Sequence, residues 1–279
     1  MTGWAACLLH GAALLDGRLP DGATRQPVPL AVGPRARIAP GPGARLSRDR
    51  LDDGERTVRR GIPCVTVERA AFDAMRTALD LREAVVAMDM VAAAELTSVL
   101  RMRRYVQGRS GWAGVGQVRA ALDLASEHSR SPNETRLRLV WVLDAGLPTP
   151  EVNRPVLDRG GRLLGVADLL DVAAGVVGEY DGADHRAARR HTRDVAKEDA
   201  LREHGLEVFR VTALDLPRTD LVVSRMRRSR SRARFLPEDA RSWTLVDPSE
   251  EPVPTLDEVL ELREWRRSVA IRSDPQVLG

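Results

Sequence analysis

The order of helical and strand patterns between residues 131 and 212 constrains the fold of this chain more than any other feature of its sequence. Ser131-Pro132-Asn133-Glu134 predicts a helix start, because a capping serine precedes a proline at the first helical position and a glutamate three residues after the cap. Three strand patterns, a charged helix and a further strand pattern follow at 151–157, 162–171, 176–181, 183–204 and 206–212. A strand that reaches another strand through a crossover helix builds a mixed or parallel sheet, so we expect an α/β domain here.

The rest of the chain differs in pattern. Prolines and glycines interrupt roughly the first sixty residues, where the apolar runs 28–32 and 64–67 predict short extended segments. Helical periodicity follows at 68–79, 81–100 and 115–127. We therefore expect a mixed, mainly helical N-terminal domain at 1–128, the α/β domain at 129–224, and a basic stretch with a C-terminal extension at 225–279.

Composition narrows the class of protein. Of 279 residues, 43% are hydrophobic and 30% are charged, which is ordinary for a globular protein. The sequence contains no run of about eighteen apolar residues that would span a membrane, and residues 1–15 lack the basic segment of a signal peptide. Cys7 and Cys64 fit no metal-binding spacing. We therefore expect a cytoplasmic protein with free thiols and no membrane partner.

Three acidic residues lie toward the ends of the second and third strand patterns: Asp168, Glu179 and Asp181. If the two strands pair side by side, the carboxylates of Asp168 and Glu179 emerge on the same face at one edge of the sheet. Like charges so close repel unless a cation is present, and Mg²⁺ prefers carboxylate oxygens. The pattern is compatible with a metal site. The alternative is that the aspartates are turn-adjacent acids and Glu179 pairs with an arginine.

Four segments of this region carry a family resemblance: SPNETRLRLVWVLDAGLPTP, LLGVADLLD, GEYDGADHR and GLEVFRVTALDL. In this order and spacing, residues 131–216 resemble the PD-(D/E)XK nuclease superfamily, and more narrowly the uncharacterised domains related to very-short-patch-repair endonucleases. The resemblance implies an αβββαβ restriction-endonuclease-like core, which is the order that periodicity also predicts. It implies that Glu134, Asp168, Glu179 and His185 are site residues, with Asp168 and Glu179 binding Mg²⁺ or Mn²⁺.

The chain departs from the superfamily pattern at Asp181, where a lysine usually follows the glutamate by two residues. That lysine would position the attacking water or stabilise charge on the phosphate, and an aspartate cannot do so as a cation. The related domains commonly carry this aspartate, so we expect Asp181 and His185 to shape the site. His185 or Lys197 is a candidate for the missing cation. Glu134 has an alternative role, because a capping box explains it fully.

Arginines cluster after the last predicted strand of the α/β domain. Between residues 218 and 234, seven arginines and one aspartate leave a local charge of +6. Such a density attracts phosphate with salt-dependent affinity, although a solvated terminal helix or arm explains it equally well. The candidates for nucleic-acid contact are Arg225, Arg227, Arg228, Arg230, Arg232 and Arg234.

The N-terminal half resembles the helical region of AbiEi-type antitoxins of abortive-infection systems, through the segments GIPCVTVERAAFDAMR and LREAVVAMDMVA. That resemblance implies a toxin protein as a partner.

From the nuclease resemblance of residues 131–216 we expect a metal-dependent DNA endonuclease that hydrolyses phosphodiester bonds. The alternative is a non-catalytic antitoxin or DNA-binding regulatory protein that retains the nuclease fold.

Overall fold

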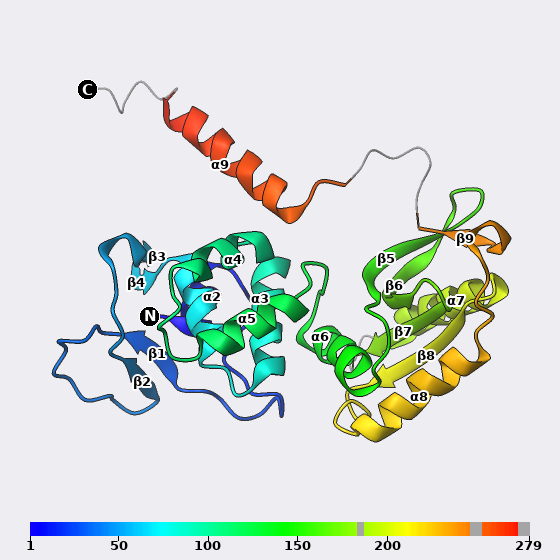
Figure 1. Ribbon diagram of the computed structural model, residues 1–279, viewed down its shortest axis with the longest axis horizontal. Helices are drawn as coiled ribbons and strands as arrows, with labels where there is room; N and C mark the ends of the chain where they lie inside the picture. The colour runs from blue at the N-terminus through cyan, green and yellow to red at the C-terminus, as the bar shows by residue number, and fades with distance from the viewer. Residues whose placement is uncertain (183–186, 246–252, 273–279) are drawn as a thin grey trace. The chain divides into compact units, whose positions relative to one another are not determined.

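A computed structural model describes residues 1–182, 187–245 and 253–272 of the chain. It divides into two compact units, which are described separately (Figure 1). The first unit combines residues 1–127 with 253–272, and the second comprises 128–245. The stretch 225–279 that the sequence sets apart does not form a unit of its own, because its described residues are divided between these two.

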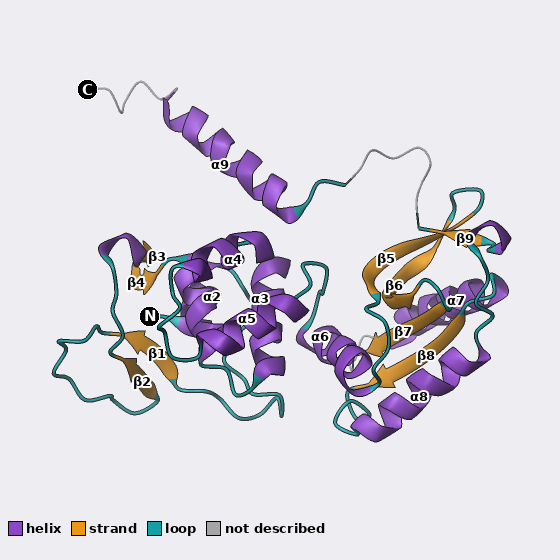
Figure 2. Cartoon of the chain, in the orientation of Figure 1, coloured by secondary structure: helices purple, strands orange, loops and turns teal. Residues whose placement is uncertain are grey.

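The second unit is mixed α/β and has the element order helix, three strands, helix, strand (Figure 2). These elements are α6 (Pro132–Leu139) with a π-helical turn (Val140–Asp144), β5 (Glu151–Asp158), β6 (Leu163–Asp171), β7 (Val176–Asp181), α7 (Ala187–Glu203) and β8 (Glu207–Thr212). The chain continues through α8 (Thr219–Arg232), a 3-10 turn (Glu238–Ala240) and β9 (Trp243–Thr244).

The strands form a mixed five-stranded sheet in the order β8-β7-β6-β5-β9. Short turns join β5 to β6 and β6 to β7, so these neighbours run antiparallel. The α7 crossover returns the chain in the same direction, so β7 and β8 run parallel. The sequence predicts a mixed or parallel sheet, and the sheet is mixed.

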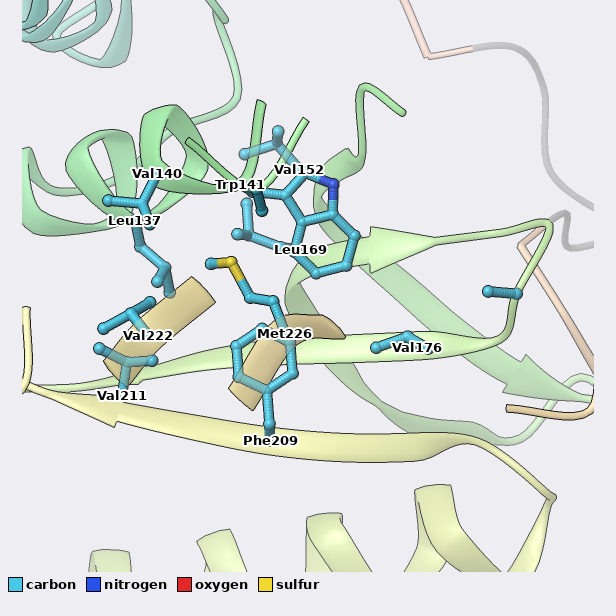
Figure 3. Packing of buried hydrophobic residues seen from close by; sticks show 12 residues of the cluster. Leu137, Val140, Trp141, Val152, Leu169, Val176, Phe209, Val211, Val222 and Met226 are labelled. Carbon is cyan, nitrogen blue, oxygen red and sulfur yellow. The ribbon is translucent and has the colours of Figure 1, made fainter. Parts of the chain in front are cut away.

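Apolar side chains cover both faces of this sheet. Val176 and Phe209 belong to the cluster shared with α6 and α8, whereas their neighbours Val177 and Val208 belong to the cluster shared with α7. This alternation follows from the two-residue period of a strand. Figure 3 shows the first cluster, in which Trp141 stacks on Phe209 with ring centroids 5.9 Å apart. The sheet therefore lies between α6 and α8 on one face and α7 on the other.

Helix α6 begins where the sequence predicts. Ser131 is the N-cap, and its Oγ accepts the Glu134 N–H at 3.2 Å, with Pro132 in the first turn. The helix widens into a π-helical turn, where Trp141 Nε1 donates to the Pro148 carbonyl at 2.7 Å. Since Trp141 is fully buried, this bond satisfies the polar atom of a core side chain.

The first unit is mainly helical, with two small two-stranded sheets. Its elements are α1 (Gly3–His10), β1 (Val28–Ala31), β2 (Ala44–Ser47), a 3-10 turn (Asp53–Glu55), β3 (Arg56–Arg59), β4 (Ile62–Val65), α2 (Val67–Arg76), α3 (Leu81–Ala93), α4 (Val99–Gln107), α5 (Val115–Leu124) and α9 (Leu256–Arg272). The apolar run 28–32 corresponds to β1, whereas 64–67 overlaps only the end of β4, because α2 begins at Val67. The helix predicted at 81–100 ends at Ala93, and α1, β2, β3 and most of α4 were not predicted.

Ion pairs are buried inside the first unit. Arg69 is fully buried, and donates from Nε to Asp73 at 2.9 Å and from Nη1 to Glu55 at 2.7 Å. Arg76 donates from Nε to the other Asp73 oxygen at 2.6 Å. Paired and hydrogen-bonded carboxylates of this kind tolerate burial that an isolated charge would not.

Polar contacts attach α9 to the first unit. Asp257 accepts from Ser98 Oγ at 2.6 Å and from Arg101 Nε at 3.2 Å. Leu260 is buried, whereas Trp265 is 62% exposed. Neither α9 nor any other helix in the described ranges has both the length and the apolar character needed to cross a bilayer.

Candidate functional site

Asp168 and Glu179 lie opposite each other on neighbouring strands. In the antiparallel β6–β7 register Leu169 pairs with Gly178 and Leu170 with Val177, and the next step places Asp168 opposite Glu179. Residues directly opposite in such a pair project from the same face of the sheet. Asp168 Oδ2 also accepts the backbone N–H of Tyr180 at 2.8 Å, which ties the carboxylate to β7.

Glu179 is held by the only lysine of the chain. Lys197, on α7, donates from Nζ to Glu179 Oε2 at 2.5 Å. The Glu179 side chain is 14% exposed, and its other oxygen, Oε1, is buried without a hydrogen-bond partner among the described residues. A buried carboxylate oxygen without a donor is costly, so this atom calls for a ligand.

Both carboxyl groups have raised pKa values. Burial is the main cause for each; the charge of Glu134 also raises the pKa of Asp168, and the charge of Asp168 also raises that of Glu179. The pKa of Glu179 reaches about 7 although Lys197 and Arg210 act to lower it. The cationic side chains nearby therefore do not fully compensate the negative charge of this site.

Glu134 is hydrogen-bonded at the start of α6 and lies near enough to Asp168 for its charge to act there. Its Oε2 accepts the backbone N–H of Arg130 at 2.9 Å, so it bonds the chain entering α6. A regular capping box would instead use the N–H of Ser131, one residue later. The same oxygen accepts from Asn153 Nδ2 at 2.7 Å, and the charge of Glu134 raises the pKa of Asp168. Glu134 thus serves the helix start and also faces the acidic site.

Gly165 creates the space through which Lys197 reaches Glu179. A Cβ on Gly165 would lie 2.7 Å from Lys197 Cγ and 3.1 Å from its Cδ and Cε, closer than side chains normally approach. The aliphatic part of the lysine side chain therefore passes over β6 at Gly165, where no side chain is in the way. The sequence offered Lys197 as a candidate cation, but only the fold connects it with Gly165.

Asn153 is a site residue that the sequence analysis missed. It lies in β5 with a φ of 49°, the left-handed region, and is 9% exposed. Its Nδ2 donates to Glu134 and to the His128 carbonyl at 2.9 Å. The sequence feature that could have identified it is an asparagine inside a strand pattern, since asparagine tolerates the left-handed conformation better than most residues.

Of the other two predicted site residues, only Asp181 lies within the described ranges, where no hydrogen bond or ion pair joins it to Asp168 or Glu179. Asp181 ends β7, is exposed and pairs in register with Thr212 of β8. His185 lies outside the described residues. Arg210 of β8 is the register partner of Glu179 and lowers its pKa, while its Nε donates to Glu198 at 2.8 Å.

The six arginines predicted to contact nucleic acid fall into two groups. Three form ion pairs within the unit: Arg225 with Asp215 at 2.7 Å, Arg230 with Asp171 at 2.9 Å and Arg232 with Glu207 at 3.1 Å. For the other three, the described residues include no carboxylate in ion-pair distance. These are the exposed Arg227, Arg228 and Arg234.

The donor set suits a hard divalent cation. Asp168 and Glu179 offer carboxylate oxygens, and the buried Glu179 Oε1 is an acceptor without a donor. In the ranges that the structure describes, no group of three or more acidic, histidine or cysteine side chains lies close enough to hold an ion together. Asp168 and Glu179 are thus a pair of carboxylates, and water would have to supply most of the other ligands of an ion bound there.

Searches of protein-family models, curated proteins and solved structures found no match to this chain. The resemblance of residues 131–216 to the nuclease superfamily thus stays a prediction. Any inference about the chemistry of the site therefore depends on the geometry of Asp168, Glu179 and Lys197.

Proposed function

We propose that the second unit is a metal-dependent endonuclease that hydrolyses phosphodiester bonds in DNA, built on a restriction-endonuclease-like αβββαβ core. One observation carries this proposal: a buried, unpartnered Glu179 oxygen beside a second carboxylate, Asp168, on the same sheet face. Two such acids repel each other, and the one ammonium at Glu179 does not offset their burial, since the pKa of Glu179 is still raised to about 7. Asp168 and Glu179 would hold Mg²⁺ or Mn²⁺, and Glu134 would assist from α6.

The bound ion supplies a Lewis acid that can activate water and stabilise charge on a phosphate. The residues of the chain have separate tasks. Asp168 is oriented by the Tyr180 N–H and Glu179 by Lys197 Nζ, so each carboxylate keeps one fixed oxygen. Lys197 would supply the positive charge that Asp181 cannot, in place of the lysine of the superfamily pattern.

The DNA contact is proposed for the arginines without an internal carboxylate partner. Arg227 and Arg228 on α8, and Arg234 just beyond it, are exposed. Each cation that contacts a phosphate adds affinity that falls with salt, without reading sequence. Arg225, Arg230 and Arg232 are engaged in ion pairs and are expected to contribute less.

The test is cleavage of supercoiled plasmid, nicked DNA and mismatched DNA with Mg²⁺ or Mn²⁺. We expect wild type to cleave, and Asp168→Asn and Glu179→Gln, which keep side-chain shape, to lose cleavage by at least about 100-fold. Asp199→Ala is the matched control, because Asp199 is an exposed acid on the same helix as Lys197.

Two results would overturn the proposal. Cleavage that persists in the Asp168→Asn/Glu179→Gln double variant would exclude this site. DNA binding without any cleavage by wild type would support the non-catalytic alternative, an antitoxin or regulatory protein.

A further inference from the structure

The three acids of the site share one arrangement, in which one oxygen is anchored and the other is open. Asp168 Oδ2 accepts the Tyr180 N–H, Glu179 Oε2 accepts Lys197 Nζ, and Glu134 Oε2 accepts two donors. Glu179 Oε1 is buried and unpartnered, and no hydrogen bond reaches Asp168 Oδ1 or Glu134 Oε1 from the described residues. Anchored carboxylates with open oxygens are what a cation or its water shell binds.

Asn153 provides the anchor for Glu134 at a conformational cost. In the β5–β6 register Val152 pairs with Leu169 and Arg154 with Ala167, which places Asn153 opposite Asp168. Its φ of 49° lies in the left-handed region, which is unfavourable for most non-glycine residues and less so for asparagine. The offsetting contacts of its amide are the bonds to Glu134 Oε2 and to the His128 carbonyl.

This anchor restricts a side chain that would otherwise be mobile. Glutamate has three rotatable side-chain bonds, and fixing it costs entropy that the Asn153 and Arg130 donors offset. Both donors reach Oε2, so Oε1 stays available. The carboxylate is held near enough to Asp168 to raise the pKa of that group.

We propose that Asn153 is a positioning residue that turns Glu134 into the third carboxylate of the site, acting on the hydrated cation held by Asp168 and Glu179. This inference rests on the proposed function. Contact through water agrees with the absence of three directly convergent ligands among the described residues. Mg²⁺ retains several waters in protein sites, and an outer carboxylate that orients them typically changes metal affinity 10- to 100-fold.

The experiment measures Mn²⁺ and Mg²⁺ binding by calorimetry on the full chain without DNA, together with thermal unfolding. Asn153→Gly removes the amide but accepts the left-handed φ, so it separates positioning from backbone strain. We expect Asn153→Gly and Glu134→Gln each to weaken metal binding about 10- to 100-fold. The double variant should bind no more weakly than Glu134→Gln, because Asn153 acts through Glu134.

A second variant tests position without touching Asn153. Glu134→Asp keeps the charge but shortens the side chain, so the carboxylate withdraws from its anchor, and metal binding should fall as in Glu134→Gln. Wild-type affinity in Glu134→Asp or in folded Asn153→Gly, or additive losses in the double variant, would overturn the inference. Asp168→Asn and Glu179→Gln report on the proposed function separately: unchanged metal binding in both, or none by wild type, would refute the site itself.

Discussion

Gly165 controls how closely Lys197 can approach Glu179. Its Cβ, if present, would lie 2.7 Å from Lys197 Cγ, and Gly165 has no positive φ, so an alanine there would force the lysine side chain to shift without straining the backbone. The proposed role of the lysine can therefore be tested without changing any charged group. That makes Gly165→Ala a complement to direct replacement of Lys197.

We predict that Lys197→Met lowers the cleavage rate about 100-fold, in the range for loss of one charge-stabilising group. Gly165→Ala should lower it in the same direction by roughly 10-fold, because the ammonium is displaced but not removed. Metal affinity should stay equal or rise in Lys197→Met, since a competing positive charge leaves. Full cleavage by both variants would show that Lys197 has only a structural role.

At the scale of the element, α8 has arginines of two kinds. Arg230 pairs with Asp171, whose side chain is 3% exposed and whose other oxygen accepts the Ala174 N–H at 3.0 Å. Arg227 and Arg228 lie exposed on the same helix. They donate to the Ala145 carbonyl and to Ser224 Oγ and form no ion pair with a described carboxylate, so the arginines of this helix divide into ion-paired and exposed ones.

We predict that Arg230→Ala destabilises the second unit by about 3 kcal/mol, because it leaves a buried carboxylate without its cation. Arg227→Ala and Arg228→Ala should change stability by less than about 0.5 kcal/mol. In DNA-binding titrations the latter two should lower the salt slope by roughly one unit for each lost phosphate contact. Equal stability of Arg230→Ala and Arg228→Ala in urea unfolding would contradict this division.

Element order was predictable from sequence because its causes are local. The cap at Ser131, the hairpin pattern around 158–162 and the strand periods act over a few residues, and the register that brings Asp168 opposite Glu179 follows from the short connection between β6 and β7. The contacts of Lys197 with Glu179 and Gly165, and of Asn153 with Glu134, join separate elements. They depend on helix placement over the sheet, which no local pattern encodes.

At the scale of the whole molecule, the two units are expected to respond to pH in opposite directions. Glu179 has a pKa raised from about 4.5 to about 7 by burial, so its contribution to stability is present at low pH and is lost as pH rises through about 7. His10 of the first unit has a pKa lowered from 6.5, mainly by burial, so its contribution is present above that value and is lost on acidification.

We therefore predict that moving metal-free protein from about pH 8 to about pH 5.5 protects the second unit and loosens the first. Hydrogen exchange resolved by peptide, corrected for intrinsic rates, measures each unit separately. Mg²⁺ should stabilise the second unit more at the higher pH, when Glu179 is ionised. Glu179→Gln should reduce the pH response of the second unit and leave that of the first unchanged, with Asp168 accounting for what remains. The same response in the variant as in wild type would assign it to other groups.

The division of the chain into units has a consequence for its synthesis. The first unit uses residues from both sides of the second, since α9 bonds Ser98 and Arg101 through Asp257. On the ribosome, where domains generally fold in the order in which they emerge, residues 1–127 leave first but lack these contacts. The second unit can complete its sheet at β9 before α9 has been made. The segment that begins the chain would thus be the last to reach its final structure.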